Sequence, residues 1–427
     1  MHDRLSVSMR WYGDSPLDGI FMTRHTPGKD DIKPIVPATE TAGRIKGLQQ
    51  SLQATDMGGA VIIQKADLFY YTGTTQTGWL YVPADGDAVL MVFKDVDRAR
   101  AETHFSQVIP VLSPKKIPAV LAKRDILLPM NLGMELDVLP ANQYFLFKEI
   151  FKSSRIMDVS GVVRQQRAVK SAYEIQCMKQ AAAMADQVAE QVRVLIRPGM
   201  PEIELAGLLE ARARKLGHQG LIRMRLWDNH LFYGHIMCGG SAAVPGAFAS
   251  PTAGAGLNPS IGQGPGRGTI RLNEPVLVDY VFALDGYLAD HTRIFSLGPV
   301  PDELEKAHEA MLAIQEAVRK AAVPGAVAGD LYETMVQMAD DLGYGEYFMG
   351  GAEPKIRFTA HGLGIELDEF PFIAKGQTMA LEAGMALAVE PKVVWPGKGV
   401  VGIENTWVVT DIGLERLTWF PDAICVL

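Results

Sequence analysis

Cysteine is scarce in this 427-residue chain, which has three widely spaced thiols, Cys177, Cys238 and Cys425. An odd number of scattered cysteines predicts free thiols in a reducing compartment and no disulfide framework. The sequence also lacks any apolar stretch near the roughly 20 residues of a membrane-spanning helix. Its polar start, residues 1–4, lacks the apolar run of a signal peptide. These absences predict a soluble cytoplasmic protein with no membrane partner.

The chain also has fewer basic than acidic residues. The 49 acidic residues outnumber the 41 lysines and arginines, which gives a net charge of −8. Nucleic-acid binding needs a basic face, so this balance argues against a nucleic-acid partner. With 48% hydrophobic and 21% charged residues, the composition is that of a folded protein, and the length predicts two or more domains.

The first part of the chain divides into an extension and an α/β domain. Residues 1–38 are polar and proline-rich, and we interpret them as an extension that packs on the surface or on a partner subunit. Residues 39–158 combine a helical pattern at Ile45, Leu48 and Leu52 with short apolar runs, which predicts an α/β domain. Its expected strands lie at 60–63, 80–82, 88–93, 108–111 and 126–128, with a hairpin turn at 85–86.

Residues 159–427 show the same order of elements twice. Ser171 and Glu174 form a capping-box pattern at the start of a long amphipathic helix, and a second helix is expected between Pro201 and Gly217. Strands follow up to residue 295. Two more helices, near 301–321 and 329–342, precede another set of strands. This order indicates a duplicated α+β unit.

Two aspartates lie in an expected hairpin of apolar strands. Asp279 is in the middle of the first strand, Asp285-Gly286 supplies a turn, and Asp290 follows in the second strand, 11 residues after Asp279. With this turn, Asp279 lies opposite Thr292, and Asp290 is its diagonal neighbour on the same face, roughly 7–8 Å away or less. A slip of one residue would separate the two carboxylates.

Three further polar residues lie in apolar surroundings downstream. Glu390 ends one apolar run, Glu404 is embedded in another, and His361 lies between glycine-containing segments. Each alone is more often structural than functional, but five together are harder to explain that way. Four buried carboxylates would repel one another, and two divalent cations would compensate them. Oxygen ligands with one imidazole suit manganese, iron, cobalt or zinc, and a metal pair can activate a bridging water.

This set of motifs resembles the pita-bread metallopeptidase family, which includes creatinase, prolidase, aminopeptidase P and methionine aminopeptidase. The resemblance covers most of the chain from about residue 40, with further matches at 71–73 and 167–171. It implies a pita-bread catalytic domain of duplicated halves over residues 159–427. It also implies a creatinase-like N-terminal α/β domain over residues 39–158.

The resemblance also implies roles for the five residues. Asp279 and Asp290 would ligate one metal, His361 and Glu390 would hold the other, and Asp290 and Glu404 would bridge the two. Glu390 also takes the position of the family's general base. A metal-bridged hydroxide would then attack a peptide carbonyl.

The residues that contact substrate in proline-specific members are different here. A histidine expected near Gly262 is missing, Asp368 stands where a second histidine is usual, and Gly402 replaces a frequent arginine. Where the family usually has Glu-Pro-Gly, this chain has Glu390-Pro391-Lys392. We expect Asp368 to face the pocket and to select a cationic or hydrogen-bond-donating group. A solvated acidic loop with Glu366 and Glu369 is an equally weighted alternative.

His230 and His235 precede the metal hairpin, and we expect one of them to replace part of the missing histidine function. One surface and one core histidine is the alternative interpretation.

Three functions stay open from the sequence. The first is a metal-dependent aminopeptidase or dipeptidase of the Xaa-Pro peptidase type. The second is a non-peptidase relative, such as a creatinase-like amidohydrolase or a lyase acting on a small molecule. The third is a binding protein without turnover. Creatinase itself lacks the metal ligands, so the intact set here favours a metal-dependent hydrolase, and the family implies a homodimer.

Overall fold

The computed structural model describes residues 32–427 except 228, 232, 247–249 and 352–354. The extension expected at residues 1–38 therefore lies mostly outside the described residues. Among these residues, the N-terminal part contains one six-stranded sheet. Its strands in spatial order are β4 (Val108–Pro110), β3 (Val89–Val92), β2 (Gly78–Pro83), β1 (Gly59–Ile62), β5 (Asn131–Met134) and β6 (Arg155–Asp158). The β1–β2 and β2–β3 pairs are antiparallel and the others are parallel.

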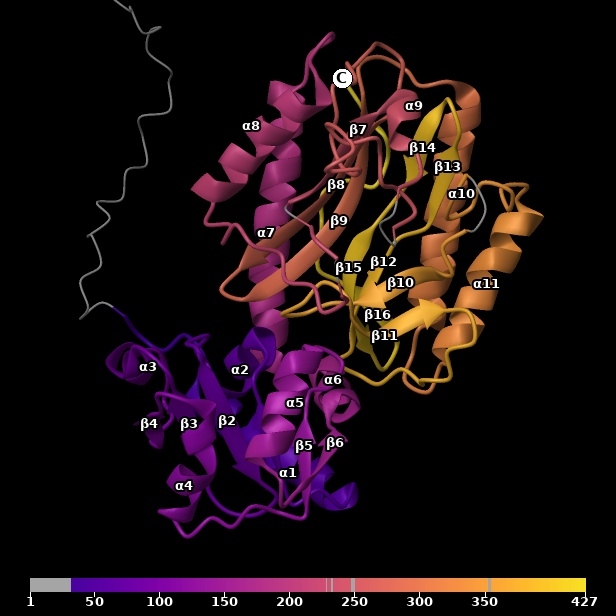
Figure 1. The fold of residues 1–427 in the computed structure, drawn as a ribbon. Helices are drawn as coiled ribbons and strands as arrows, with labels where there is room; N and C mark the ends of the chain where they lie inside the picture. The colour runs from indigo at the N-terminus through magenta and orange to yellow at the C-terminus, as the bar shows by residue number, and fades with distance from the viewer. Residues whose placement is uncertain (1–31, 228, 232, 247–249, 352–354) are drawn as a thin grey trace, which may run out of the picture.

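Helices accompany this sheet along the chain (Figure 1). They are α1 (Ala38–Ala54), α2 (Lys65–Thr72), α3 (Val96–Glu102), α4 (Ile117–Ala122), α5 (Ala141–Ile150) and α6 (Ser160–Ala168). The apolar face of α1 buries Leu48 and Leu52 in a core that continues into the second part of the chain through Tyr71 and Tyr287. The two parts are therefore joined by a common apolar core.

The second part is built on three groups of strands in the described residues. One sheet has the order β17 (Cys425–Val426), β9 (Tyr287–Ser296), β8 (Val276–Leu284) and β7 (Gly234–Cys238). A second has the order β11 (Glu369–Ala374), β10 (Phe358–Gly362), β12 (Ala386–Val389), β15 (Asn405–Thr410) and β16 (Gly413–Arg416). A ribbon pairs β13 (Lys392–Trp395) with β14 (Gly399–Gly402). An antiparallel bridge between Thr292 and Glu404 connects the first sheet to the second.

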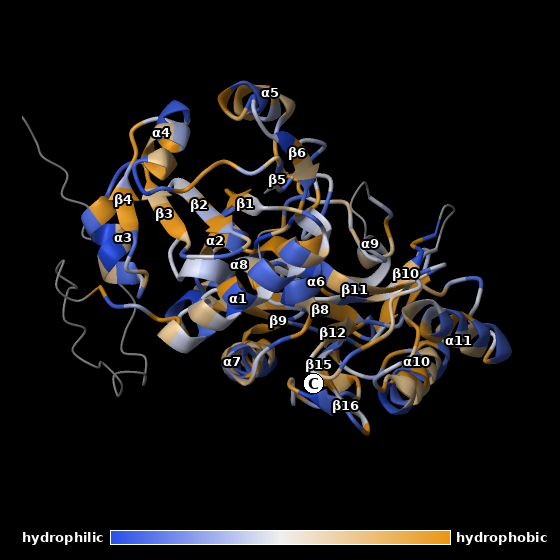
Figure 2. Cartoon of the chain, turned by 90° about the horizontal axis from the view of Figure 1, so that it is seen from below, coloured by the Kyte–Doolittle hydropathy of each residue, from blue (hydrophilic) through white to orange (hydrophobic). Residues whose placement is uncertain are grey.

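Two pairs of long helices cover these strands from opposite sides. Helices α7 (Ala172–Leu195) and α8 (Glu202–Lys215) pack together, and α7 lies on β8 and β9. Helices α10 (Asp302–Ala321) and α11 (Ala328–Asp341) cover the β13–β14 ribbon and the second sheet, and the short α9 (Gly239–Ala242) follows β7. Figure 2 shows β8, β9 and β12 between α7 on one side and α10 and α11 on the other. The concave strands between the helix pairs hold the site described below.

Most of the expected elements are present. Ser171 and Glu174 form the capping box of α7, and the hairpins at 85–86 and 285–286 are as predicted.

The prediction of a strand at 126–128 is wrong. Asp125 adopts a left-handed φ of 58° after α4, Leu127 is 85% exposed, and the strand begins at Asn131 instead. Proline at 129 cannot donate a ladder hydrogen bond, which opposes strand pairing at this point.

Candidate metal centre

The β8–β9 hairpin places the two aspartates. Asp285 and Gly286 form its turn with φ values of 49° and 91°, which suits a tight two-residue hairpin. The resulting register pairs Asp279 with Thr292 and Val281 with Asp290. Asp279 and Asp290 are therefore diagonal neighbours, as the spacing predicts, and both are buried.

The other three expected ligands come from the second sheet and its connections. His361 lies on β10, Glu390 follows the end of β12, and Glu404 lies between β14 and β15. Strands β10 and β12 pair directly, and Glu404 forms the bridge to Thr292 on β9. Residues more than 100 positions apart in the chain therefore meet at the seam between the two sheets.

All five of these side chains line one cavity. Asp290, His361 and Glu404 offer ligand atoms that lie within 4.8 Å of one another. Apolar side chains complete part of the wall, and they are Leu231, Val281, Phe358 and Leu367. A polar centre inside an apolar wall is typical of a small-molecule site.

Hydrogen bonds orient the imidazole of His361. Its Nδ1 lies 3.0 Å from the carbonyl oxygens of Gly362 and Leu367. Carbonyls only accept hydrogen bonds, so Nδ1 carries the proton and donates it. The other nitrogen, Nε2, therefore lies on the side of the ring toward Glu390 and Glu404, each 3.9 Å away, where it can act as a metal ligand.

The carboxylates are held by neighbouring side chains. The Thr292 hydroxyl donates to Glu404 at 2.8 Å, and the Thr406 hydroxyl accepts from the Asp290 backbone N–H at 2.9 Å. The guanidinium of Arg293, which is fully buried, donates to the backbone carbonyl of Glu404 at 2.8 Å. These contacts fix the direction of the ligands, as outer groups do in metal sites.

Burial makes the negative charge of the centre costly. It raises the pKa of Asp290 well above its ordinary value, and Glu404 and Asp279 add to the rise. Burial also raises the pKa of Glu390 to about 7, although Lys392 opposes it. Burial alone would lower the pKa of His361, but the carboxylates around it shift that pKa upward. The cluster therefore needs compensating positive charge.

Part of that charge comes from Lys392. Its Nζ lies 2.7 Å from Glu390, 2.9 Å from Glu404 and 3.2 Å from Asp279, and the side chain is fully buried. Burial would lower the pKa of Lys392, but the three carboxylates raise it well above its ordinary value, which favours the ammonium form.

The remaining donors fit a divalent metal. Asp290 is 4% exposed, and its Oδ1 has no hydrogen-bond partner among the described residues. Asp290 also groups with His361 and Glu404, and a carboxylate and imidazole set suits manganese, iron, cobalt or zinc. The structure thus contains a buried Asp/His/Glu cluster capable of holding metal, while the space between Asp279 and Glu390 contains the ammonium.

The expected substrate residues fall in different places. Asp368 lines the cavity, with its carboxylate 3.7 Å from Nδ1 of His361 and its side chain 15% exposed. His235 is buried, lines the same cavity and pairs with Asp279 across β7 and β8. His230 is exposed and is not among the residues that line the cavity. The roles of Asp368 and His235 stay predictions.

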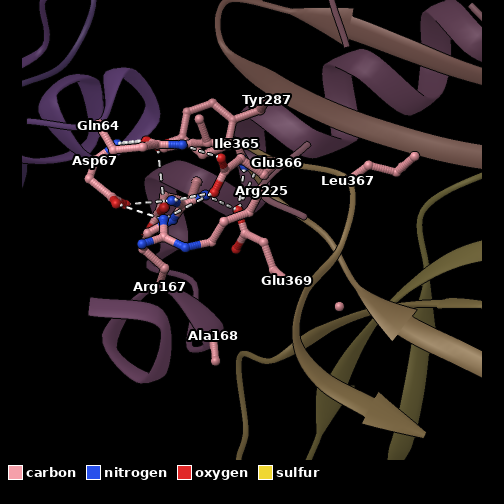
Figure 3. A network of polar contacts seen from close by, with 12 residues as sticks. Gln64, Asp67, Arg167, Ala168, Arg225, Tyr287, Ile365, Glu366, Leu367 and Glu369 are labelled. Atoms are coloured by element: carbon pink, nitrogen blue, oxygen red, sulfur yellow. Dashed lines mark hydrogen bonds and ion pairs between the residues drawn. The ribbon is translucent and has the colours of Figure 1, made fainter. Parts of the chain in front are cut away.

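A buried ionic cluster supports the segment that carries Asp368. Arg167 contacts Asp67 of α2, Glu366 and Glu369, and Arg225 also contacts Asp67 (Figure 3). Glu366 and Glu369 are 1% and 5% exposed, so the alternative of a solvated acidic loop is wrong for these two residues. Figure 3 shows Leu367 pointing away from the cluster. Its carbonyl accepts from His361, so the cluster supports both the cavity wall and the imidazole.

In the sequence, Lys392 stands out only as a departure from the family motif. One signal was available, because residues two apart in an extended segment point to the same side, and Lys392 is two residues after Glu390. Arg293 gave no such signal, since its position next to Thr292 puts it on the opposite face of β9.

Comparison with known proteins agrees with this architecture. The sequence matches metallopeptidase family M24 over residues 176–411 and the creatinase/prolidase N-terminal domain over residues 44–169. It is 25% identical over 376 residues to the Xaa-Pro dipeptidase of Pyrococcus furiosus, which covers 88% of this chain and 97% of the relative. It is 28% identical over 386 residues to the Xaa-Pro dipeptidase of Lactobacillus helveticus, with coverage of 87% and 95%.

A solved structure shows the same fold. The Xaa-Pro dipeptidase from Bacillus anthracis superposes with a TM-score of 0.77 at 25% identity, over 91% of this chain and 100% of that chain. The predicted pita-bread fold with a creatinase-like N-terminal domain is confirmed, as is the prediction of a hydrolase of this family. Because the M24 match spans more than half of its length, the chain belongs to metallopeptidase family M24.

Proposed function

We propose that the protein is a metal-dependent dipeptidase of the Xaa-Pro peptidase type. The observation that carries this proposal is the convergence of Asp279, Asp290, His361, Glu390 and Glu404 on one cavity. The relatives named as Xaa-Pro dipeptidases support the choice of a dipeptide substrate. The sequence predicts two divalent ions, and manganese, cobalt, zinc and iron all suit the donors.

Several residues of the chain have a proposed part in the reaction. A divalent ion bound at the centre supplies Lewis acidity to a substrate carbonyl and lowers the pKa of a bound water. Glu390 is the proposed general base, because its carboxylate lies at the ligand cluster and lines the cavity. Asp368 is proposed to pair with a cationic group of the substrate, and the amino terminus of a dipeptide is such a group.

One observation favours a second candidate, a non-peptidase hydrolase or lyase acting on a small cationic molecule. A carboxylate at Asp368 and the lack of any histidine between His235 and His291 leave few groups that could stabilise an oxyanion. The two candidates share the metal centre and differ in the substrate that they act on and in the bond that they break.

Turnover on a matched substrate panel distinguishes them. The purified, manganese-loaded chain is incubated with Xaa-Pro dipeptides, other dipeptides and the same dipeptides blocked by N-acetylation. We expect cleavage of free dipeptides, loss of cleavage after acetylation, and no cleavage by Glu390→Gln. Full metal loading with no turnover of any dipeptide would refute the dipeptidase and leave the small-molecule candidate.

Assembly and location are also proposals. The family resemblance supports a homodimer, and the cysteine usage supports a cytoplasmic location. Among the helices of the described residues, none has the length and apolar character needed to cross a membrane. Light scattering on the purified chain tests the dimer.

A further inference from the structure

Lys392 lies where the carboxylates of the metal centre converge. Its ammonium contacts Asp279, Glu390 and Glu404 within 3.2 Å, and its side chain is 0% exposed. It is not among the residues that line the cavity, whereas the three carboxylates are. The three carboxylates therefore surround the ammonium.

The β13–β14 ribbon is shaped to hold this side chain. Lys392 pairs with Gly402, which has a φ of 147° that L side chains rarely adopt. A Cβ at residue 402 would lie 2.4 Å from the Pro391 carbonyl oxygen and 3.1 Å from Cγ of Lys392. Because Gly402 has no side chain, the aliphatic part of the Lys392 side chain has room beside it. The backbone of the β13–β14 ribbon therefore sets the position of Lys392.

The two glutamates divide their oxygens between two positions. Oε2 of Glu390 and Oε2 of Glu404 contact the ammonium, at 2.7 and 2.9 Å. The Oε1 atoms of both lie 3.9 Å from Nε2 of His361. Carboxylates that divide their oxygens in this way bridge two cations, and the first of these positions already contains the lysine nitrogen.

We propose that the Lys392 ammonium replaces one of the two divalent cations, so that each chain binds a single divalent ion. The ligands of that ion are Asp290, His361, Glu390 and Glu404. The orphaned Oδ1 of Asp290 marks its position. This inference rests on the metal centre of the proposed function, and it differs from the two ions that the sequence predicts.

The space in the centre favours one ion, and the charge of the centre is compatible with one. Four carboxylates carry four negative charges, which one ammonium and one divalent ion reduce to a single net charge. A second divalent ion would have to enter between Asp279 and Glu390, where the ammonium is tethered and buried. Like charges at this distance repel strongly in a buried site, so the second ion is excluded.

Metal stoichiometry tests the inference. Chelator-treated protein is loaded with excess Mn²⁺, desalted and measured by inductively coupled plasma mass spectrometry and by electron paramagnetic resonance. We expect about one Mn²⁺ per wild-type chain, with the signal of an isolated ion. Lys392→Met removes the charge at similar volume, and we expect about two Mn²⁺ per chain with a spin-coupled signal, because paired ions then occupy both positions.

Lys170→Met is the matched control. Lys170 is also a buried lysine beside a carboxylate, Glu369, but it lies in the ionic cluster outside the metal centre. We expect this variant to keep one ion per chain.

Two Mn²⁺ ions per wild-type chain would overturn the inference, and this measurement does not depend on whether Lys392→Met folds. A folded Lys392→Met that still binds one ion would also overturn it. Dipeptide turnover is recorded on the same samples, so the two proposals fail separately. One bound ion without turnover refutes the dipeptidase alone, and two bound ions with turnover refute the single-ion site alone.

Discussion

Replacing Arg167 with Met tests the ionic cluster that joins the N-terminal part to the cavity wall. Arg167 contacts Glu366 at 2.8 Å and both Asp67 and Glu369 at 2.5 Å. None of these four side chains is more than 6% exposed, so water does not replace the lost cation. Removing one partner of a buried pair costs about 3–5 kcal/mol, because the other charge is left uncompensated.

The other cations of the cluster limit this loss. Arg225 still contacts Asp67 at 2.7 Å, and Lys170 still lies 3.2 Å from Glu369. We therefore expect the free energy of unfolding to fall by about 3–5 kcal/mol in total, and not by that amount for each of the three contacts.

Urea unfolding followed by tryptophan fluorescence measures the difference. Lys179→Met is the control, because Lys179 contacts Glu415 at 2.7 Å on the surface, with both side chains more than 40% exposed. We expect the control to cost less than about 1 kcal/mol. Equal losses in Arg167→Met and Lys179→Met would refute the view that the buried cluster holds the two parts together.

The same variant changes the pH dependence of stability. Burial alone would raise the pKa values of Asp67 and Glu369, but Arg167 with its neighbouring cations holds both at about 2. Folded pKa values below the unfolded ones stabilise the protein above roughly pH 4, and this stabilisation is lost as the pH falls toward 2. We expect wild type to lose stability across this window and Arg167→Met to lose less. A steeper loss in the variant would contradict the assignment.

Three further predictions follow from the centre and from α7. Glu390→Gln should lower turnover by at least about 100-fold with an unchanged circular dichroism spectrum, because the amide cannot act as a base; unchanged turnover would remove Glu390 from the mechanism. Asp368→His should raise cleavage of Xaa-Pro dipeptides and lower turnover of substrates that rely on the carboxylate, and if neither rate moves, Asp368 does not determine specificity. Ser171→Ala removes the hydrogen bond to the Glu174 N–H and should cost about 1 kcal/mol in urea unfolding; an unchanged midpoint would show that the cap contributes nothing.

Local pattern was enough to predict the elements that carry the site. The hairpin register is set by a two-residue turn at Asp285-Gly286 and by alternation along two apolar strands, so the pairing of Asp279 with Thr292 follows from the sequence. The capping box at Ser171 is equally local. The strand misplaced at 126–128 shows the limit, because this segment follows a left-handed turn that the composition does not reveal, and Leu127 within it is exposed.

The contents of the metal centre were decided by tertiary structure. The alternation of side chains in an extended segment puts Lys392 on the same side as Glu390. It does not predict that this side contacts Asp279, which lies in another sheet. That meeting depends on the bridge between Thr292 and Glu404, which joins segments more than 100 residues apart. The sequence alone therefore determined most of the strands, the register of the β8–β9 hairpin and the five candidate ligands, because these depend on neighbours in the chain. Only the packing of the two sheets decided that a lysine nitrogen shares the centre with the ligands, because the charge around a buried group is set by whatever the fold brings beside it.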